Sequence, residues 1–402
     1  MSQNSTDLAL AGSCSNLTIQ LGQCNGLPIC GFCYNFGQYQ KPAPEYELYN
    51  MILICLILPM LGFFGLIGNS LSAFVYSRKS MRSSLNCYLF SLAFSDITII
   101  STSFFLFFLE SMRKRSAFVS KYFALTAPLM FPLGLTAQSL SVFLTVSAAF
   151  DCFILVIASD RIKEKICTPA TAKWVVMTNI LLAVLFNISH VFEISVIHCW
   201  NTHYTQPSYD VCPTELRQNE IYFTFYYAYL YTIVMAVGPV LLLIILNTAI
   251  VIIMRHTRES GQTSDSGSDI ATFVLIVCLF IACNIMPLTV NFLELMLSIE
   301  NSYLIDASNL MVVLNSSCNF IIYYVFGDQF RRTLKAELPV ALLIQRTLPL
   351  KYSSVDEEFL PESILCQTGV PSPLITALSK KPSQSLLEIN GNTKQNGKRC
   401  HV

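Results

Sequence analysis

Residues 51–76, MILICLILPMLGFFGLIGNSLSAFVY, form an apolar stretch that contains no Asp, Glu, Lys or Arg. As a helix, a stretch of this length crosses the roughly 30 Å of hydrocarbon in a bilayer. Six further apolar stretches follow at residues 86–109, 126–158, 174–192, 221–254, 270–298 and 303–326. None alternates between polar and apolar residues as the strands of a membrane barrel do. The sequence therefore predicts an all-α membrane protein with a seven-transmembrane helix bundle.

The composition of the whole chain also indicates a membrane protein. Its 402 residues are 53% hydrophobic and only 12% charged, which is about half the usual share of charged residues in a soluble domain. This hydrophobicity excludes intrinsic disorder of the main body. The net charge is zero, whereas nucleic-acid-binding domains are strongly basic. We therefore expect membrane lipid around the helices and no nucleic-acid partner.

The distribution of Lys and Arg predicts which end of the chain lies outside the cell. Residues 1–13 lack the basic start and apolar run of a signal peptide, so we expect the first span to act as its own insertion signal. An outer N-terminus places most Lys and Arg of the connecting segments inside, as multi-pass proteins prefer. We expect a plasma-membrane location. The basic run at residues 112–115 is an exception, because it lies in a segment predicted to be outside. It is either a solvated loop or a docking patch for acidic ligand groups.

The spans divide the chain into three parts. Residues 1–48 are expected to form an extracellular tail, in which Asn4 and Asn16 begin N-glycosylation motifs. Residues 49–335 hold the seven helices and a short amphipathic helix 8. Residues 336–402 are rich in Ser, Pro, Lys and Gln, which predicts a mostly disordered cytoplasmic tail.

Six of the fifteen cysteines lie in segments predicted to be outside, where disulfides can form. The six outer cysteines are Cys14, Cys24, Cys30, Cys33, Cys199 and Cys212. Cys30 and Cys33 form a CxxC motif. Because no histidine or second such pair is nearby, the motif favours disulfides over a zinc site. The connectivity cannot be read from the sequence.

Motifs inside the spans resemble those of rhodopsin-type G-protein-coupled receptors. The second span holds SLAFSD at residues 91–96, similar to the LAxxD pattern of that family. The seventh span holds NSSCNFIIY at residues 315–323, a variant of NPxxY in which Phe320 replaces proline. FGDQFRR at residues 326–332 resembles helix 8. The resemblance implies a heterotrimeric G protein as partner, with kinases and arrestin acting on the tail.

Further motifs resemble invertebrate FMRFamide-type neuropeptide receptors. They are PLGLTAQ at residues 132–138, FE at 192–193, YLYT at 229–232, CN at 283–284 and NFLE at 291–294. The resemblance implies an extracellular RFamide peptide that shifts the bundle to a G-protein-binding state. The alternatives are a non-signalling decoy, a chemosensory receptor and, from another class, a transporter. No nucleophile–base pair or metal-ligand cluster occurs in the spans, so we do not expect an enzyme.

Candidate ligand-binding residues lie near the predicted outer ends of the spans. Gln138 and Asn291 are polar where lipid contact is costly, so we expect them to point into the bundle. Tyr222 and Tyr226 share a helix face, which lines either a peptide pocket or the lipid belt. Four carboxylates predict an acidic rim that attracts a cationic peptide, although each can also be merely solvated. They are Glu110, Glu193, Glu294 and Asp306.

A polar core is predicted near the middle of the membrane. Asp96 lies about 15 Å into the second span, so its carboxylate needs partners. Ser141, Asn315 and Ser316 are the candidates. The resemblance implies that this cluster binds an allosteric sodium ion. The alternative is a neutral Asp96 hydrogen-bonded to its neighbours and water. No other metal or cofactor is expected.

Several positions that the resemblance assigns to activation switches depart from the family pattern. Asp151-Cys152-Phe153 lacks the arginine that contacts the G protein, and Cys283-Asn284 replaces the tryptophan switch. The cysteine expected at the outer end of the third span is also missing. Cys199 or Cys212 must then pair with the other or with the N-terminal tail. The remaining switch candidates are Asn69, Pro239, Pro287, Asn319 and Tyr323.

Overall fold

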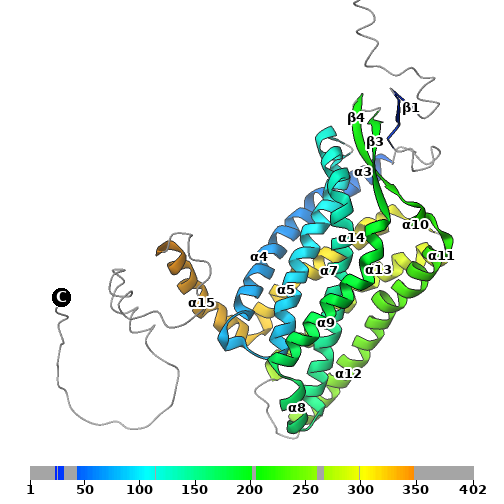
Figure 1. The fold of residues 1–402 in the computed structure, drawn as a ribbon. Helices are drawn as coiled ribbons and strands as arrows, with labels where there is room; N and C mark the ends of the chain where they lie inside the picture. The colour runs from blue at the N-terminus through cyan, green and yellow to red at the C-terminus, as the bar shows by residue number, and fades with distance from the viewer. Residues whose placement is uncertain are drawn as a thin grey trace, which may run out of the picture. The chain divides into compact units, whose positions relative to one another are not determined.

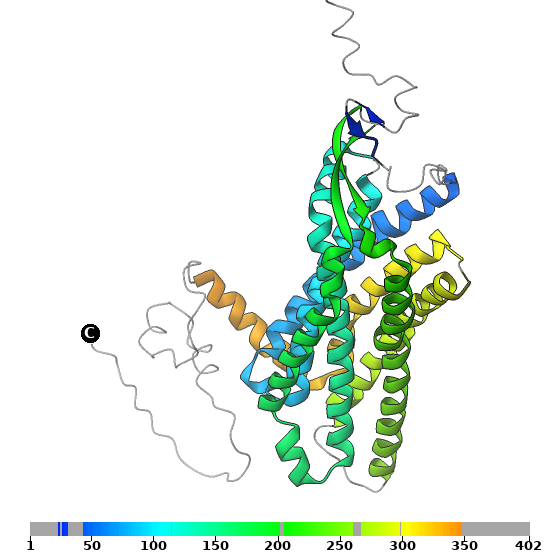
Figure 2. The same cartoon turned by 45° about the vertical axis from the view of Figure 1, so that its right-hand side comes forward.

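The computed structural model describes residues 23–24, 26–30, 43–113, 115–201, 205–259, 267–297 and 299–347. In this part of the chain, seven helices are long and apolar enough to cross a membrane. They are Pro44–Tyr76, Ser84–Arg113, Ala117–Ile157, Pro169–Phe192, Glu220–His256, Ile270–Glu294 and Ser302–Phe326. The predicted all-α seven-helix bundle is confirmed (Figure 1 and Figure 2).

Each span is built from one to three helical segments. The α-helices are α3 (Pro44–Asn50), α4 (Leu58–Tyr76), α5 (Ser84–Ser103), α6 (Leu109–Arg113), α7 (Ala117–Ile157), α8 (Asp160–Ile166), α9 (Pro169–Asn187), α10 (Glu215–Gln218), α11 (Glu220–Tyr222), α12 (Gly238–Glu259), α13 (Gly267–Leu297), α14 (Ser302–Phe326) and α15 (Asp328–Thr347). The π-helical stretches are η1 (Met51–Ile57), η3 (Phe104–Phe108) and η5 (Phe223–Val237). The 3-10 turns are η2 (Lys79–Met81) and η4 (Ile188–Phe192).

The third span is longer than the sequence predicts. α7 begins at Ala117 rather than at residue 126, and its 41 residues extend about 60 Å, roughly twice the hydrocarbon thickness. Ser116 caps the start by accepting a hydrogen bond from the backbone N–H of Val119. The polar residues Ser120 and Lys121 end the apolar pattern without ending the helix. α7 is therefore longer than a bilayer requires, and it supports the hairpin that follows the fourth span.

Two glycines let the first span approach the seventh closely. A Cβ atom on Gly65 would lie 2.2 Å from Ser317 Oγ, and one on Gly68 would lie 2.8 Å from Phe320 Cβ. Next to Gly68 in the chain, the Asn69 side-chain amide donates to the backbone oxygen of Ser316 at 2.8 Å. Small residues are typical at such contacts because membrane helices associate through close packing and hydrogen bonds. Larger side chains at either glycine would push α4 and α14 apart.

A β-hairpin follows the fourth span and packs against the outer end of α7 (Figure 1). Its strands β3 (Ile194–Asn201) and β4 (Gln206–Pro213) pair antiparallel, with Cys199 opposite Ser208. A smaller hairpin of the N-terminal tail, β1 (Gln23–Cys24) and β2 (Leu27–Pro28), leads into it. Ile29 forms a bridge with Trp200, whose backbone oxygen accepts a hydrogen bond from the Cys30 N–H at 3.0 Å. The N-terminal tail thus joins the edge of the larger hairpin.

A disulfide between Cys30 and Cys199 makes this attachment covalent. Cys212 is also disulfide-bonded, and its partner lies outside the described side chains. The bridge from the loop to the N-terminal tail is therefore confirmed, and the alternative of a Cys199–Cys212 bridge is wrong. Cys14, Cys33 and the glycosylation candidates Asn4 and Asn16 lie outside the described residues, and only the backbone of Cys24 is described.

After the last span, Gly327 separates α14 from α15, the expected helix 8. Phe330 is buried, with its ring 5.3 Å from that of Tyr76 and 5.5 Å from that of Tyr323. α15 runs to Thr347, which is further than the amphipathic motif at residues 326–332. The compact unit that holds the bundle ends at Glu337, within this helix. The apolar side of the first turns of α15 is therefore anchored on the C-terminal ends of the first and seventh spans.

Candidate ligand-binding cavity and polar core

The larger cavity is about 440 Å³ and lies between the second, third and seventh spans and β4. Its apolar lining includes Phe107, Phe123 and Phe131. Glu110 and Arg113 are its charged residues, and Gln138 lies on its wall. Aromatic walls with a few placed polar groups are typical of small-ligand sites, and the volume falls within their usual range. We call this space the outer cavity.

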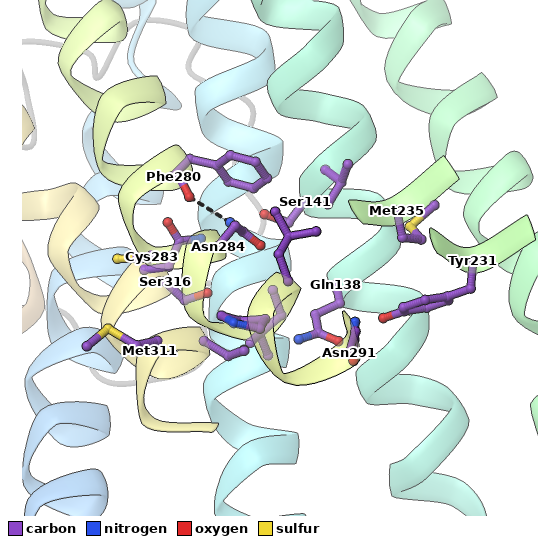
Figure 3. A pocket seen from close by; sticks show the side chains of 16 residues that line it. Gln138, Ser141, Tyr231, Met235, Phe280, Cys283, Asn284, Asn291, Met311 and Ser316 are labelled. Carbon is purple, nitrogen blue, oxygen red and sulfur yellow. Dashed lines mark hydrogen bonds between the residues drawn. The ribbon is translucent and has the colours of Figure 1, made fainter. Parts of the chain in front are cut away.

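A second, smaller space of about 80 Å³ lies between the third, fifth, sixth and seventh spans, and we call it the inner cavity (Figure 3). Ile99, Gln138 and Val312 line both cavities. Much of the inner lining is polar. The polar residues are Gln138, Ser141, Asn284, Asn291, Asn315 and Ser316. The cavity is thus a hydrogen-bonding environment in the middle of the bundle, and Gln138 lies at its junction with the outer cavity.

The structure places the four predicted rim carboxylates in different environments. Glu110 pairs with Arg113, with Oε2 and Nε 2.7 Å apart. Asp306 is buried and accepts a hydrogen bond from the Asn50 side-chain amide at 2.8 Å. Glu294 is half-buried, lines neither cavity, and has no hydrogen bond or ion pair within the described residues. Of these three, Glu110 alone faces the outer cavity.

The fourth carboxylate, Glu193, is fully buried and lines neither cavity. Its oxygens accept from Arg217 Nη1 at 2.7 Å, the Tyr222 hydroxyl at 2.6 Å and the Tyr227 hydroxyl at 2.5 Å. His190 Nδ1 lies 2.8 Å from Oε1. Burial by itself would raise the pKa of Glu193, but these hydrogen bonds outweigh it and lower the pKa to about 2. Glu193 therefore stays ionised and joins the fourth and fifth spans instead of forming an exposed rim.

The two predicted tyrosines belong to this same Glu193 cluster. Tyr222 and Tyr226 stack with ring centroids 5.4 Å apart. The Tyr226 hydroxyl donates to the backbone oxygen of Phe186 at 2.8 Å. Neither tyrosine lines the outer or inner cavity. Tyr231, two turns further along the fifth span, lines the inner cavity instead (Figure 3).

Asp96 is buried beside the inner cavity with incompletely satisfied oxygens. Its Oδ2 accepts from the Asn319 amide at 2.8 Å, while its Oδ1 has no hydrogen-bond partner within the described residues. The Ser316 hydroxyl is also buried and lacks such a partner there. Oxygen donors suit hard cations such as sodium, and unsatisfied buried oxygens need an ion or water. Asp96 and Ser316 therefore fit a sodium ion, and Ser141 and Asn315 line the adjoining cavity.

Residues 56–339 match the family model described as serpentine type 7TM GPCR chemoreceptor Srw. The chain belongs to the seven-transmembrane G-protein-coupled receptors. It is 55% identical over 350 residues to "Probable G-protein coupled receptor frpr-1" of Caenorhabditis elegans, covering 83% of this chain and 92% of that relative. It is 30% identical over 322 residues to the "FMRFamide receptor" of Drosophila melanogaster, covering 77% and 56%. The receptor is thus FMRFamide-receptor-like, as the motifs indicate.

The altered switch residues at 151–153 lie near the C-terminal end of α7. Asp151 is buried and accepts a hydrogen bond from the Ser84 hydroxyl. Burial, together with the nearby Asp151 carboxylate, raises the pKa of Cys167 to about 12, so this thiol stays protonated. Cys152 is fully buried, and the neighbouring Phe153 is half-buried. The receptor therefore stabilises Asp151 with a serine instead of the adjacent arginine of the family pattern.

The other switch candidates lie along the bundle axis of the receptor. Pro239 follows the π-helical stretch η5, and Pro287 lies inside α13. Cys283 and Asn284 line the inner cavity, where the Asn284 amide donates to the Phe280 backbone oxygen at 2.7 Å (Figure 3). Tyr323 is buried with its ring 5.2 Å from that of Tyr76.

Sequence reasoning missed two charged contacts of the outer cavity. Arg113 Nη1 forms an ion pair with Asp210 Oδ1 at 3.0 Å, in addition to its pair with Glu110. The side chains of Arg113 and Asp210 are only 22% and 8% exposed. Arg113 belongs to the basic run at residues 112–115, which lies in a segment predicted to be outside, where Lys and Arg are usually fewer. This unusual position was the feature of the sequence that could have identified Arg113 as a functional residue. No local pattern marks Asp210, because its role depends on how the hairpin folds.

Proposed function

We propose that this chain is a plasma-membrane receptor for an extracellular cationic peptide that ends in Arg-Phe-amide. Its N-terminus lies outside, and bound peptide favours a bundle conformation that activates a heterotrimeric G protein. The supporting observation is the outer cavity, which combines aromatic walls, a carboxylate and deeper amide groups. The Cys30–Cys199 disulfide supports the orientation, because such bonds persist in the oxidising space outside the cell.

The chemistry of each cavity region suits one part of such a peptide. A phenylalanine ring suits the aromatic walls around Phe107, Phe123 and Phe131. A guanidinium suits Glu110, because two carboxylates and one guanidinium in the Glu110–Arg113–Asp210 group leave an excess negative charge. A terminal carboxamide suits the Gln138 amide, which can both donate and accept hydrogen bonds. The name of the Drosophila melanogaster relative, "FMRFamide receptor", supports the same class of ligand.

The test uses membranes of cells that express the whole receptor. Labelled Arg-Phe-amide peptide should bind, while the same peptide with a free C-terminal carboxylate or with norleucine in place of arginine should bind more weakly. Nucleotide exchange on added G protein, measured in the same membranes, reports coupling. Equal binding of all three peptides would contradict the proposed ligand chemistry. Binding without exchange would contradict coupling and favour the decoy function.

A chemosensory function is the second candidate. It is favoured by the description of the matching family model, which names chemoreceptors. The outer cavity is large enough for a small molecule on its own. Activation by small volatile or soluble molecules, with no binding of any Arg-Phe-amide peptide, would favour this function over the peptide receptor.

A further inference from the structure

The β3–β4 hairpin forms part of the ligand-cavity wall but is not joined to the helices by a described disulfide. Val211 of β4 lines the outer cavity. Cys199 is bonded to Cys30 of the N-terminal tail. Among the described residues, the cysteines within the helices form no disulfide. The first turns of the third span, residues 117–128, contain no cysteine. Noncovalent contacts must therefore hold this wall against the bundle.

Arg113 lies where three structural elements meet beside Val211. Its guanidinium pairs with Asp210 of β4 at 3.0 Å and with Glu110 of α6 at 2.7 Å. The guanidinium carbon also lies 5.2 Å from the centre of the Phe123 ring on α7. A planar guanidinium can make all three contacts at once, whereas a lysine ammonium is a point charge without the fork geometry. One side chain thus connects the hairpin to the second and third spans.

The burial of these groups makes the connection stronger than a surface ion pair. Exposed pairs contribute little because water screens them. Removing one partner of a mostly buried pair leaves an uncompensated charge and is strongly destabilising. Asp210 Oδ1 also accepts a hydrogen bond from the Val211 backbone N–H at 2.9 Å. The position of the Asp210 carboxylate is therefore linked directly to the backbone of the cavity-lining residue.

We propose that Arg113 is a positioning residue for ligand binding, which holds β4 as a wall of the outer cavity by bridging Asp210 to the helices. This inference rests on the proposed function only in assuming that the cavity binds peptide. The Arg113–Asp210 ion pair holds the hairpin against the helices, as a disulfide to the third span would. Loss of the bridge should loosen β4 and weaken binding, even where the substituted residue does not touch the ligand.

The first measurement needs no ligand. Hydrogen–deuterium exchange of β4 backbone amides is followed by mass spectrometry on the purified full-length receptor. Arg113→Ala and Asp210→Ala should each speed exchange in β4. The double variant Arg113→Asp with Asp210→Arg keeps the same set of charges, so β4 should exchange more slowly in it than in either single variant. Recovery is partial, because the carboxylate at position 113 lies beside Glu110 and does not contact the Phe123 ring. Arg115→Ala is the matched control, because exposed Arg115 contacts Ser111 and Met51 rather than the hairpin.

The second measurement is the affinity of labelled Arg-Phe-amide peptide for the same variants at matched surface expression. Each single variant should raise the Kd by about tenfold, within the usual range for coupling between sites, and the charge-swapped variant should partly restore it. Unchanged β4 exchange in Arg113→Ala would overturn the inference. A loss of affinity without faster exchange, or no recovery in the swapped variant, would also overturn it. If the native receptor binds no peptide, the proposed ligand fails while the exchange data still decide the role of Arg113.

Discussion

Replacing Glu193 with glutamine should destabilise the outer half of the receptor. The side chain keeps its size but loses its charge. Its new NH2 group would replace one carboxylate oxygen. It would then face either Arg217 Nη1 and the Tyr227 hydroxyl, which now donate to Oε2, or the Tyr222 hydroxyl and His190 Nδ1, which lie at Oε1. The Glu193 pKa of about 2, compared with an ordinary 4.5, measures how much the folded protein favours the ionised form. At about 1.4 kcal/mol per pKa unit, this preference corresponds to about 3 kcal/mol.

The assay is thermal stability of the purified, ligand-free receptor in detergent. A loss of about 3 kcal/mol should lower the midpoint of unfolding by roughly 4 °C, because an unfolding entropy of about 2 cal/mol/K per residue amounts to about 0.8 kcal/mol/K for a protein of this size. Glu300→Gln is the control, because it makes the same charge change at an exposed residue and should have little effect. A Glu193→Gln midpoint equal to that of the control would refute the reasoning.

The same carboxylate predicts the pH dependence of stability. Because the folded-state pKa of Glu193 is depressed, its contribution is fully present above its ordinary pKa of 4.5 and is lost as pH falls toward about 2. The difference in midpoint between the native protein and Glu193→Gln should therefore stay constant from about pH 8 to pH 5.5. A difference that disappears across that interval would show that the Glu193 pKa is close to neutral rather than near 2.

Three further predictions concern ligand binding and signalling. Glu110→Gln should weaken an Arg-Phe-amide peptide by about 1–3 kcal/mol, whereas Glu294→Gln should not, and a double-mutant cycle with the norleucine peptide measures the pairing. Peptide affinity should be lower in sodium chloride than in choline chloride, and Asp96→Asn should abolish this difference; a persistent difference would place the ion elsewhere. Cys152→Arg should raise maximal nucleotide exchange at matched expression with little change in affinity. Equal activation by the native form would assign the missing arginine's role to another residue.

Polar residues in the middle of the membrane were predictable because lipid makes their exposure costly. Asp96 needed buried partners wherever the helices packed, and the observed donor is Asn319. Gln138 and Asn291 were expected to point inward for the same reason, and both line the inner cavity. Asn319 itself was identified only through the resemblance of its motif. The inward orientation of these residues was predictable from the lipid environment alone, without knowing which residues they contact.

The charged residues at the outer surface were not predictable in the same way. Glu193 and Glu110 look alike in the sequence, but one is fully buried among four donors and the other faces a cavity. Water tolerates either arrangement, so hydropathy carries no information about which occurs. Asp210 acquires its role from a hairpin register that pairs it with Ile197 and directs it toward Arg113.

Seven membrane-crossing helices were predictable from the sequence, because a bilayer imposes the same length and polarity rule on every span. The likeness to FMRFamide receptors was predictable from motifs such as those at residues 132–138 and 291–294. The sequence also limited Cys199 to a few partners. Only the tertiary structure decided that Cys199 pairs with Cys30 and that Arg113 joins β4 to the helices. The physical reason is that disulfides and ion pairs act over a few ångströms between distant segments, so the folded chain alone brings their partners together.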